Sequence, residues 1–376
     1  MKTLLFDFTS GSLLLLIFLL ITNSKKINKK GNRWLALFLT CIFFLVADES
    51  LSSNHIYHQI PGIIGFENFF IFLSAPALYF SVLFYVSVER TFSKKDYLHF
   101  APALLFSPVA LLSLFENSAL KLKMLSAEPE SVSAGSIDIL LILLFVQITT
   151  YIILCYKILL KHRKNVRLFS SSTEIIDLNW LQQFIKALGV MLAFWMLNSF
   201  FPISFFIHFS PFVYFTGILF LAYHALRQNE IYPFSEPDKL EIKELIRKEE
   251  ADLPKRQLRF SEQELNEKKQ YLQQEMELRK YYLEDTLSLP KLAEYTQNST
   301  HDLSYIINEG FGENFFQFVN RYRVEEAKRL LLSSKSAQLN ILGIAYESGF
   351  NSKTTFNTTF KKMTGVSPSE FVKNNT

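Results

Sequence analysis

Residues 341–360, ILGIAYESGFNSKTTFNTTF, decide the fold of the C-terminal part of the chain. Apolar residues recur at helical spacing on both sides of Gly349, and a glycine at this point supplies the positive φ that a tight turn between two helices requires. Phe356 and Phe360 stand four residues apart, so they share one buried face of the second helix. The stretch therefore predicts a helix-turn-helix unit.

A similar pattern comes earlier, in residues 289–307. Pro290 is suited to the start of a helix, and Ala293 allows two helices to approach closely. Ser299 is a suitable N-cap for the helix that follows. The C-terminal part therefore contains two helix-turn-helix units in tandem, separated by a long amphipathic stretch.

Many residue types stand at fixed intervals across this tandem. The most specific positions are Arg323, Val324, Ala327, Leu330, Leu331, Ile344, Ala345, Gly349, Phe350, Ser352, Phe356, Phe360, Lys361, Lys362, Gly365, Ser367, Pro368 and Phe371. With these residues, the chain from 287 to 373 resembles the AraC/XylS family of transcription regulators. The resemblance implies two recognition helices in the DNA major groove, joined by a rigid linker helix at about 315–332. We expect Arg323 to be a structural ion-pair partner and not a DNA contact.

The first unit departs from the family pattern at its turn. Gln297 stands at the position that matches Gly349, and Asn298 stands at the apolar position after it. Asparagine tolerates left-handed backbone conformations, so a turn at this point is still expected.

The residues that lie off the apolar face of each recognition helix are the candidate DNA contacts. Asparagine and lysine can read base edges, and hydroxyl groups bond to bases or phosphates. The candidates are Thr300, His301, Ser304 and Tyr305 in the first unit, Ser352, Lys353, Thr354 and Asn357 in the second, and Lys361 and Lys362 as contacts to backbone phosphates.

The first 226 residues have a different composition, with long runs almost free of charge. Lengths near 20 apolar residues suit a bilayer crossing. We predict seven membrane spans, at about 5–23, 34–52, 63–88, 97–115, 137–160, 180–201 and 205–226. Asp48 and Glu49 interrupt the second span, which makes it the least regular. No secretory cleavage site follows the first apolar run, so we expect that run to be retained as a membrane helix.

Lysine and arginine are concentrated in the odd-numbered loops, and basic loops remain on the cytoplasmic side. The basic residues of these loops are Lys25, Lys26, Lys29, Lys30, Arg33, Arg90, Lys94, Lys95, Lys157, Lys161, Arg163, Lys164 and Arg167. The even-numbered loops offer only Lys121 and Lys123. The N-terminus is therefore expected outside, and the odd number of spans delivers the C-terminal part to the cytoplasm.

Several ionisable residues lie within or at the edge of the predicted spans: Asp48, Glu49, His99, Lys186 and His208. Such residues are costly in a membrane and raise the hypothesis of a signal sensor, but we favour the simpler interpretation, in which Lys186 snorkels to the cytoplasmic end of its span and Asp48, Glu49 and His208 lie at the outer interface. Cys41 and Cys155 fall in apolar runs and receive no function. We find no HExxH, GxSxG or GxxxxGK[ST] pattern. No catalytic residue, metal or cofactor is expected.

Residues 227–285 are densely charged with mixed sign, which is typical of solvated helix and linker. Ser261 and Glu264 form a capping box, which predicts a helix from about 262 to 280. Its narrow apolar stripe can pack against the following domain or against the same helix of a second copy, so a homodimer is left open.

The expected fold is all-α: a seven-helix transmembrane bundle at 1–226, a charged helical linker at 227–285 and an AraC-type domain at 286–376. The expected function is that of a transcription regulator in the cytoplasmic membrane, which binds double-stranded DNA and is controlled by an unknown small molecule or membrane signal. The alternative is a membrane receptor or transporter whose helical tail binds a protein partner. No motif supports an enzyme.

Overall fold

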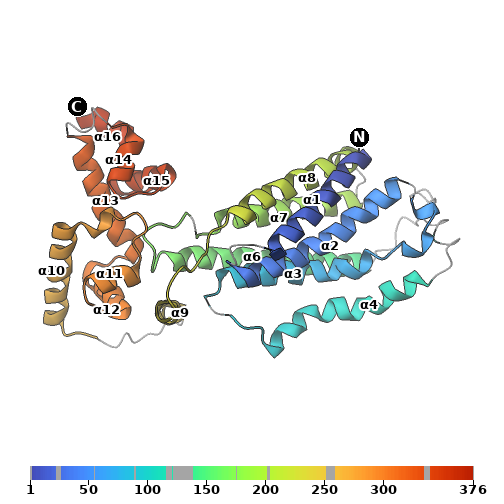
Figure 1. Cartoon of the computed structure of the whole chain (residues 1–376), viewed down its shortest axis with the longest axis horizontal. Helices are drawn as coiled ribbons and strands as arrows, with labels where there is room; N and C mark the ends of the chain where they lie inside the picture. The colour runs from blue at the N-terminus through green and yellow to red at the C-terminus, as the bar shows by residue number, and fades with distance from the viewer. Residues whose placement is uncertain are drawn as a thin grey trace. The chain divides into compact units, whose positions relative to one another are not determined.

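The computed structural model describes residues 2–22, 27–54, 56–88, 90–115, 121, 139–174, 176–200, 204–250, 259–333 and 339–375. In these residues the regular secondary structure is helical, apart from one isolated β-bridge between Ser170 and Ser288. The chain divides into two compact units (Figure 1). The first unit comprises Met1–Leu160 and Asn179–Ile231, and the second comprises Lys161–Leu178 and Tyr232–Thr376.

Each predicted membrane span coincides with a described helix. The helices are α1 (Lys2–Thr22), α2 (Lys29–Ser53), α3 (Asn68–Val86), α4 (Ala101–Leu114), α6 (Ile139–Val166), α7 (Asn179–Phe200) and α8 (Ser204–Arg227). In the first unit α2 packs against both α1 and α3, while α8 packs against α1 and α7. The apolar runs of the sequence therefore form a helical bundle.

Five of these helices are long and apolar enough to cross a membrane: α1, α2, α3, α6 and α7. Helix α4 has only 14 residues. At about 1.5 Å per residue it is roughly 21 Å long, whereas the hydrocarbon core of a bilayer is about 30 Å thick. Seven crossings therefore stay a prediction, with five candidates supported by length and composition among the described residues.

The close approach of α2 and α3 depends on a glycine. A Cβ atom at Gly31 would lie 3.0 Å from the ring of Tyr85, and the Ser81 hydroxyl donates to the Gly31 carbonyl at 3.1 Å. The Trp34 ring lies 5.0 Å from that of Phe80, between centroids. Aromatic packing and small residues thus join these two helices.

Three of the candidate sensor residues have polar or aromatic partners within the first unit. Asp48 accepts a hydrogen bond from a tyrosine hydroxyl, and the Nδ1 atom of His99 lies 2.8 Å from the hydroxyl oxygen of Tyr151. The Lys186 ammonium lies 5.9 Å from the centroid of the Tyr156 ring. A sensing role stays a prediction for each of them. The side chain of His208, most of the predicted outer loop 116–136, Lys25 and Lys26, and the C-terminal residue lie outside the described parts.

The second unit is built from short helices. They are α9 (Glu236–Glu250), α10 (Glu262–Arg279), η5 (Tyr281–Leu283), α11 (Leu289–Tyr295), α12 (Thr300–Tyr305), the π-helical turn η6 (Ile306–Gly310), α13 (Phe315–Leu331), α14 (Ile341–Glu347), α15 (Lys353–Thr364) and α16 (Pro368–Asn375). Helix α10 begins at the predicted capping box, where the Glu264 amide donates to the Ser261 hydroxyl at 3.2 Å. Its Leu272 and Met276 are buried within the unit.

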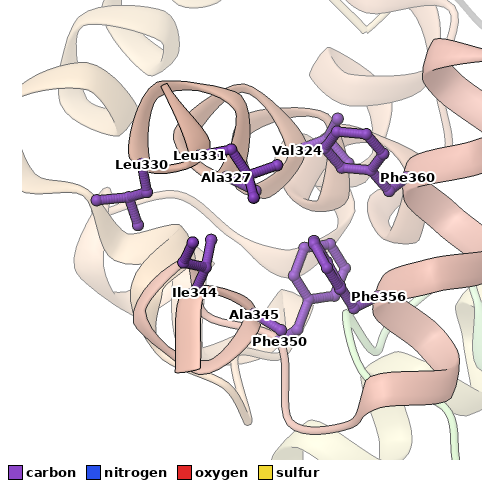
Figure 2. Close-up of a cluster of buried hydrophobic side chains, with 9 residues drawn as sticks. All are labelled: Val324, Ala327, Leu330, Leu331, Ile344, Ala345, Phe350, Phe356 and Phe360. Atoms are coloured by element: carbon purple, nitrogen blue, oxygen red, sulfur yellow. The ribbon is translucent and has the colours of Figure 1, made fainter. Parts of the chain in front are cut away.

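A single apolar cluster joins the linker helix to the second helix-turn-helix (Figure 2). Its members are Val324, Ala327, Leu330 and Leu331 of α13, Ile344 and Ala345 of α14, Phe350 of the turn, and Phe356 and Phe360 of α15. Figure 2 shows the Phe356 and Phe360 side chains on the inner side of α15. The opposite side of α15 is therefore left for other contacts.

One segment lies elsewhere than the sequence suggested. Residues 161–178, the end of α6 and the connection from it to α7, were expected in the membrane half, but they pack with the C-terminal residues in the second unit. Their hydrogen bonds to that unit connect positions more than 100 residues apart in the chain. Local sequence patterns carry no information about such long-range pairs.

Candidate nucleic-acid interface

The two helix-turn-helix units repeat the same backbone turn. In the first, the Asn298 amide donates to the Ala293 carbonyl at 2.9 Å. In the second, the Phe350 amide donates to the Ala345 carbonyl at 3.0 Å. The alanine packs where the two helices approach, as its small side chain suggested, and is buried in both units. The tandem units predicted from sequence are therefore present as matching structures.

Each turn contains one residue with left-handed backbone. Gln297 has φ 53° and Gly349 has φ 88°. The turn in the first unit thus forms at Gln297 itself, and the tolerance of Asn298 for this conformation is not used. At Gly349 a Cβ atom would lie only 2.3 Å from the carbonyl oxygen of Tyr282, so glycine is required there by space as well as by φ.

Serine residues cap both recognition helices. The Ser299 hydroxyl accepts from the Asp302 amide at 3.1 Å, and the Ser352 hydroxyl accepts from the Thr355 amide at 3.1 Å. These bonds satisfy amide groups of the first turn that have no partner within the helix. Ser352 is half-buried, and its hydroxyl oxygen already accepts the capping hydrogen bond. A contact of Ser352 with DNA would have to use the same hydroxyl group.

Arg323 of the linker helix α13 is a structural residue, as expected, but its partners are different. Its side chain is 1% exposed and donates to the carbonyl oxygens of Tyr282 at 2.7 Å and Glu284 at 2.6 Å. It also donates to the carbonyl and hydroxyl oxygens of Ser171, at 3.2 and 3.0 Å. Burial lowers the pKa of the Arg323 guanidinium to about 10. The expected ion pair is replaced by hydrogen bonds to uncharged oxygens.

The candidate contacts on α12 are largely covered. Thr300 is 3% exposed and Ser304 is 9% exposed, so their side chains have no access to a duplex in this structure. His301 and Tyr305 are half-buried, and the Tyr305 ring lies 5.7 Å from that of Phe260. Helix α9 and the segment before α10 pack against α12 within this unit. The first recognition helix therefore offers little free surface.

The environment of His301 disfavours its charged form. Burial lowers its pKa below the ordinary histidine value, and the positive charges of Lys248 and Arg259 lower it further. Arg259 is itself paired with Asp302, at 2.8 Å between Nη1 and Oδ1. At neutral pH His301 is therefore uncharged and adds no positive charge for a phosphate.

The candidate contacts on α15 are accessible. Lys353 and Thr354 are exposed at its start, and Lys361 and Lys362 are exposed in its last turn. Asn357 is half-buried one turn after Lys353. These lysines are exposed, whereas Phe356 and Phe360 of the same helix point into the apolar cluster of Figure 2. The second recognition helix therefore has the charge and exposure that a DNA-binding helix needs.

Thr355 is a residue of this surface that the sequence did not single out. Its hydroxyl donates to the Glu174 carboxylate at 2.9 Å. The two residues are 181 positions apart, so no spacing rule could have paired them. Thr355 is half-buried and follows the candidate Thr354 directly, so its place in the first turn of a recognition helix was the available signal.

Metal binding has no support in the described residues, where no group of three or more potential ligands comes together. Cys41 and Cys155 are both free and buried.

A family model described as a helix-turn-helix domain matches residues 292–374. This range covers both units and the linker helix.

Curated relatives share the same region. An uncharacterised HTH-type transcriptional regulator of Staphylococcus aureus strain COL and another of strain MSSA476 are each 36% identical over 85 residues, which is 23% of this chain. The aligned residues make up 11% of each relative's length, so the likeness concerns this domain alone. No solved structure matches the chain. The C-terminal part is therefore a helix-turn-helix domain similar to those of transcriptional regulators.

Proposed function

We propose that this protein is a membrane-anchored, AraC-type transcription regulator that binds duplex DNA sequence-specifically with its C-terminal domain. The observation that carries the proposal is the duplication of the capped turn, with an exposed and basic α15 in the second copy. The protein acts by binding and not by catalysis. A protein-binding tail, the alternative, has no need of a basic recognition helix after such a turn.

The linker helix supports a two-site contact with DNA. Helix α13 has 17 residues, which correspond to about 26 Å at 1.5 Å per residue. Successive major-groove segments on one face of DNA are roughly 34 Å apart. Recognition helices at the two ends of α13 can therefore reach neighbouring groove segments once α12 is uncovered.

Membrane anchoring is supported by the five long apolar helices of the first unit. The proposed topology has seven crossings in the cytoplasmic membrane, an external N-terminus and a cytoplasmic DNA-binding domain. It follows from the lysine and arginine content of the odd-numbered loops. A reporter enzyme fused after the last residue should be active only if that reporter works in the cytoplasm, and activity of a periplasmic reporter there would contradict the topology.

The test of DNA binding uses the whole chain in lipid nanodiscs. Duplexes selected from a random pool are titrated against scrambled duplexes at several salt concentrations. We expect the selected sequence to bind more tightly at every salt concentration. Removal of Lys361 and Lys362 by alanine substitution should weaken binding to both duplexes equally, with a salt dependence that is lower by about 0.9 in slope per lost phosphate contact.

A double alanine substitution of Arg247 on α9 and Arg279 on α10 is the matched control, because it removes the same charge from exposed positions outside the tandem units. Equal affinity for selected and scrambled duplexes at every salt concentration would contradict sequence-specific recognition. Such a result, together with capture of a defined protein, would favour the protein-binding alternative.

A further inference from the structure

Residues 167–174, hereafter the docked segment, lie in the second unit, where they are bound to the helix-turn-helix domain by backbone hydrogen bonds. The Leu289 amide donates to the Phe169 carbonyl at 2.8 Å, and the Ser171 amide donates to the Leu287 carbonyl at 3.2 Å. These two bonds flank the antiparallel bridge between Ser170 and Ser288. The segment thus pairs with the chain directly before α11 in the manner of an added strand.

The carbonyl groups of the docked segment also satisfy helix N-termini. Leu289 is the first residue of α11, and Phe316 is the second residue of α13, where its amide donates to the Arg167 carbonyl at 3.1 Å. First-turn amides have no acceptor within their own helix. Since the segment supplies acceptors to two helices, it is an integral part of the domain's hydrogen bonding and not a passing loop.

Ser171 lies at the centre of this arrangement. Its carbonyl accepts from the Asn320 amide nitrogen at 3.0 Å and from Arg323, and its hydroxyl accepts from Arg323 at 3.0 Å. Ser171, Asn320 and Arg323 are all at most 1% exposed. Leaving such buried donors without acceptors is costly, so the segment cannot leave this site without rearrangement of Arg323.

Arg323 connects the docked segment to the second recognition unit. It also donates to the Tyr282 carbonyl, the same oxygen that lies against Gly349 in the turn before α15. A shift of Ser171 therefore acts, through one guanidinium group and one carbonyl, on the turn that positions the basic recognition helix.

The far end of the docked segment reaches α15 directly. Glu174 is exposed and accepts a hydrogen bond from Thr355, in the first turn of that helix and two residues from Lys353. The first turn of a helix favours negative groups, and in a DNA complex a phosphate would use this region. A carboxylate already at this position competes with the phosphate for the same hydroxyl and repels it.

From this arrangement, and resting on the DNA-binding function proposed above, we propose that the docked segment is the regulatory element. In the docked state the segment is bound to the second recognition unit, and Glu174 occupies the position that a DNA phosphate would take. DNA binds when the segment leaves this site. The segment is joined covalently to α6 on one side and leads to α7 on the other. A change in the spacing of these two apolar helices therefore displaces the docked segment. In this way a signal at the membrane changes the affinity of the domain for DNA.

A disulfide across the bridge tests the proposal. The bonds on either side of Ser170 and Ser288 mark a non-hydrogen-bonded antiparallel pair, in which the Cα atoms are about 4.5 Å apart, within the range that disulfides accept. The full chain with Ser170→Cys and Ser288→Cys, in nanodiscs, is titrated with its selected duplex in oxidised and in reduced form. We expect oxidation to weaken binding about tenfold, the effect of one lost charge-assisted contact.

The two forms of one protein are matched controls for each other, and the single Ser170→Cys variant controls for oxidation elsewhere. Equal affinity of the oxidised and reduced forms would overturn the regulatory role and leave the proposed DNA-binding function intact. If the unaltered chain binds no duplex at all, the proposed function fails and the regulatory role fails with it.

A second variant addresses the carboxylate alone. Glu174→Gln keeps an oxygen acceptor for Thr355 but removes the negative charge, so the selected duplex should bind several-fold more tightly, and less so at high salt. Glu267→Gln, an exposed substitution on α10, is the control and should leave the affinity unchanged. Unchanged affinity in Glu174→Gln would show that the carboxylate does not compete with DNA.

Discussion

The two helix-turn-helix units have the same turn but different surroundings. In the first, α12 is covered by α9 and by the segment around Phe260, and its candidate contacts Thr300 and Ser304 are buried. In the second, α15 exposes lysines at both ends and receives Glu174 at its first turn. The ability of such a helix to contact DNA therefore depends on which other elements pack over it, as well as on its own sequence.

The largest effect should come from Arg323 of α13, which lies over the Phe350 ring and bonds to the carbonyl oxygen that lies against Gly349. Arg323→Met removes the arginine donor from the Tyr282 carbonyl oxygen and leaves the Glu284 carbonyl oxygen with the Leu287 amide alone. Each lost charge-assisted hydrogen bond is worth about 1.5–3 kcal/mol, so we expect a loss of about 3–5 kcal/mol in the local stability of α14 and α15, measured by hydrogen exchange of their amides in the intact protein. Arg279→Met, at an exposed position on α10, should change it by less than about 0.5 kcal/mol. An equal loss in both variants would contradict the bracing role.

The two turns should respond differently to substitution. Gly349→Ala combines a left-handed backbone with a Cβ atom 2.3 Å from a carbonyl oxygen, so α14 and α15 should lose about 3 kcal/mol of local stability. Gln297→Gly removes the strain of a left-handed glutamine and should stabilise the first turn by about 0.5–1 kcal/mol. Hydrogen exchange reports both. If Gln297→Gly leaves the local stability of the first turn unchanged or lowers it, the backbone at Gln297 is not strained.

DNA affinity should depend more on the second helix than on the first. Lys353→Ala is expected to cost about 1–3 kcal/mol of binding to the selected duplex and to relax preference at one base position. His301→Ala should cost less, because His301 is uncharged and half-buried. The losses of affinity in the two variants are compared by titrating each protein with the selected duplex and with single-base variants of that duplex. A larger loss from His301→Ala would mean that α12 is the main reading helix.

The smallest effect concerns pH. The pKa of His301 is lowered in the folded protein, so the unfolded chain binds the proton more readily once the pH falls below about 6.5, its ordinary value. Local stability of α12 should therefore be complete above that pH and decrease as the pH falls below it, whereas α15, which has no histidine, should not follow this change. Hydrogen exchange corrected for intrinsic rates provides the measurement. His301→Asn should abolish the dependence, and its persistence in that variant would assign it to another group.

The sequence predicted much of the local structure correctly. The capping box of Ser261, the caps at Ser299 and the turn at Gly349 depend on neighbouring residues, and each is present in the structure. The apolar face of α15 follows from the helical period, and Phe356 and Phe360 are buried as expected. The number of membrane crossings predicted for the first unit does not follow from local rules, since α4 has only 14 residues.

Contacts between distant parts of the chain decided the rest. By itself the sequence determined the all-helical fold and the two recognition units, because helical periodicity, caps and turn residues act over fewer than about ten positions. Only the tertiary structure could bring Ser171 to Arg323 and Glu174 to Thr355, across 152 and 181 positions. Such pairs arise from hydrogen-bond satisfaction in the folded domain, since the donors of α11, α13 and Arg323 need acceptors that no neighbouring residue supplies.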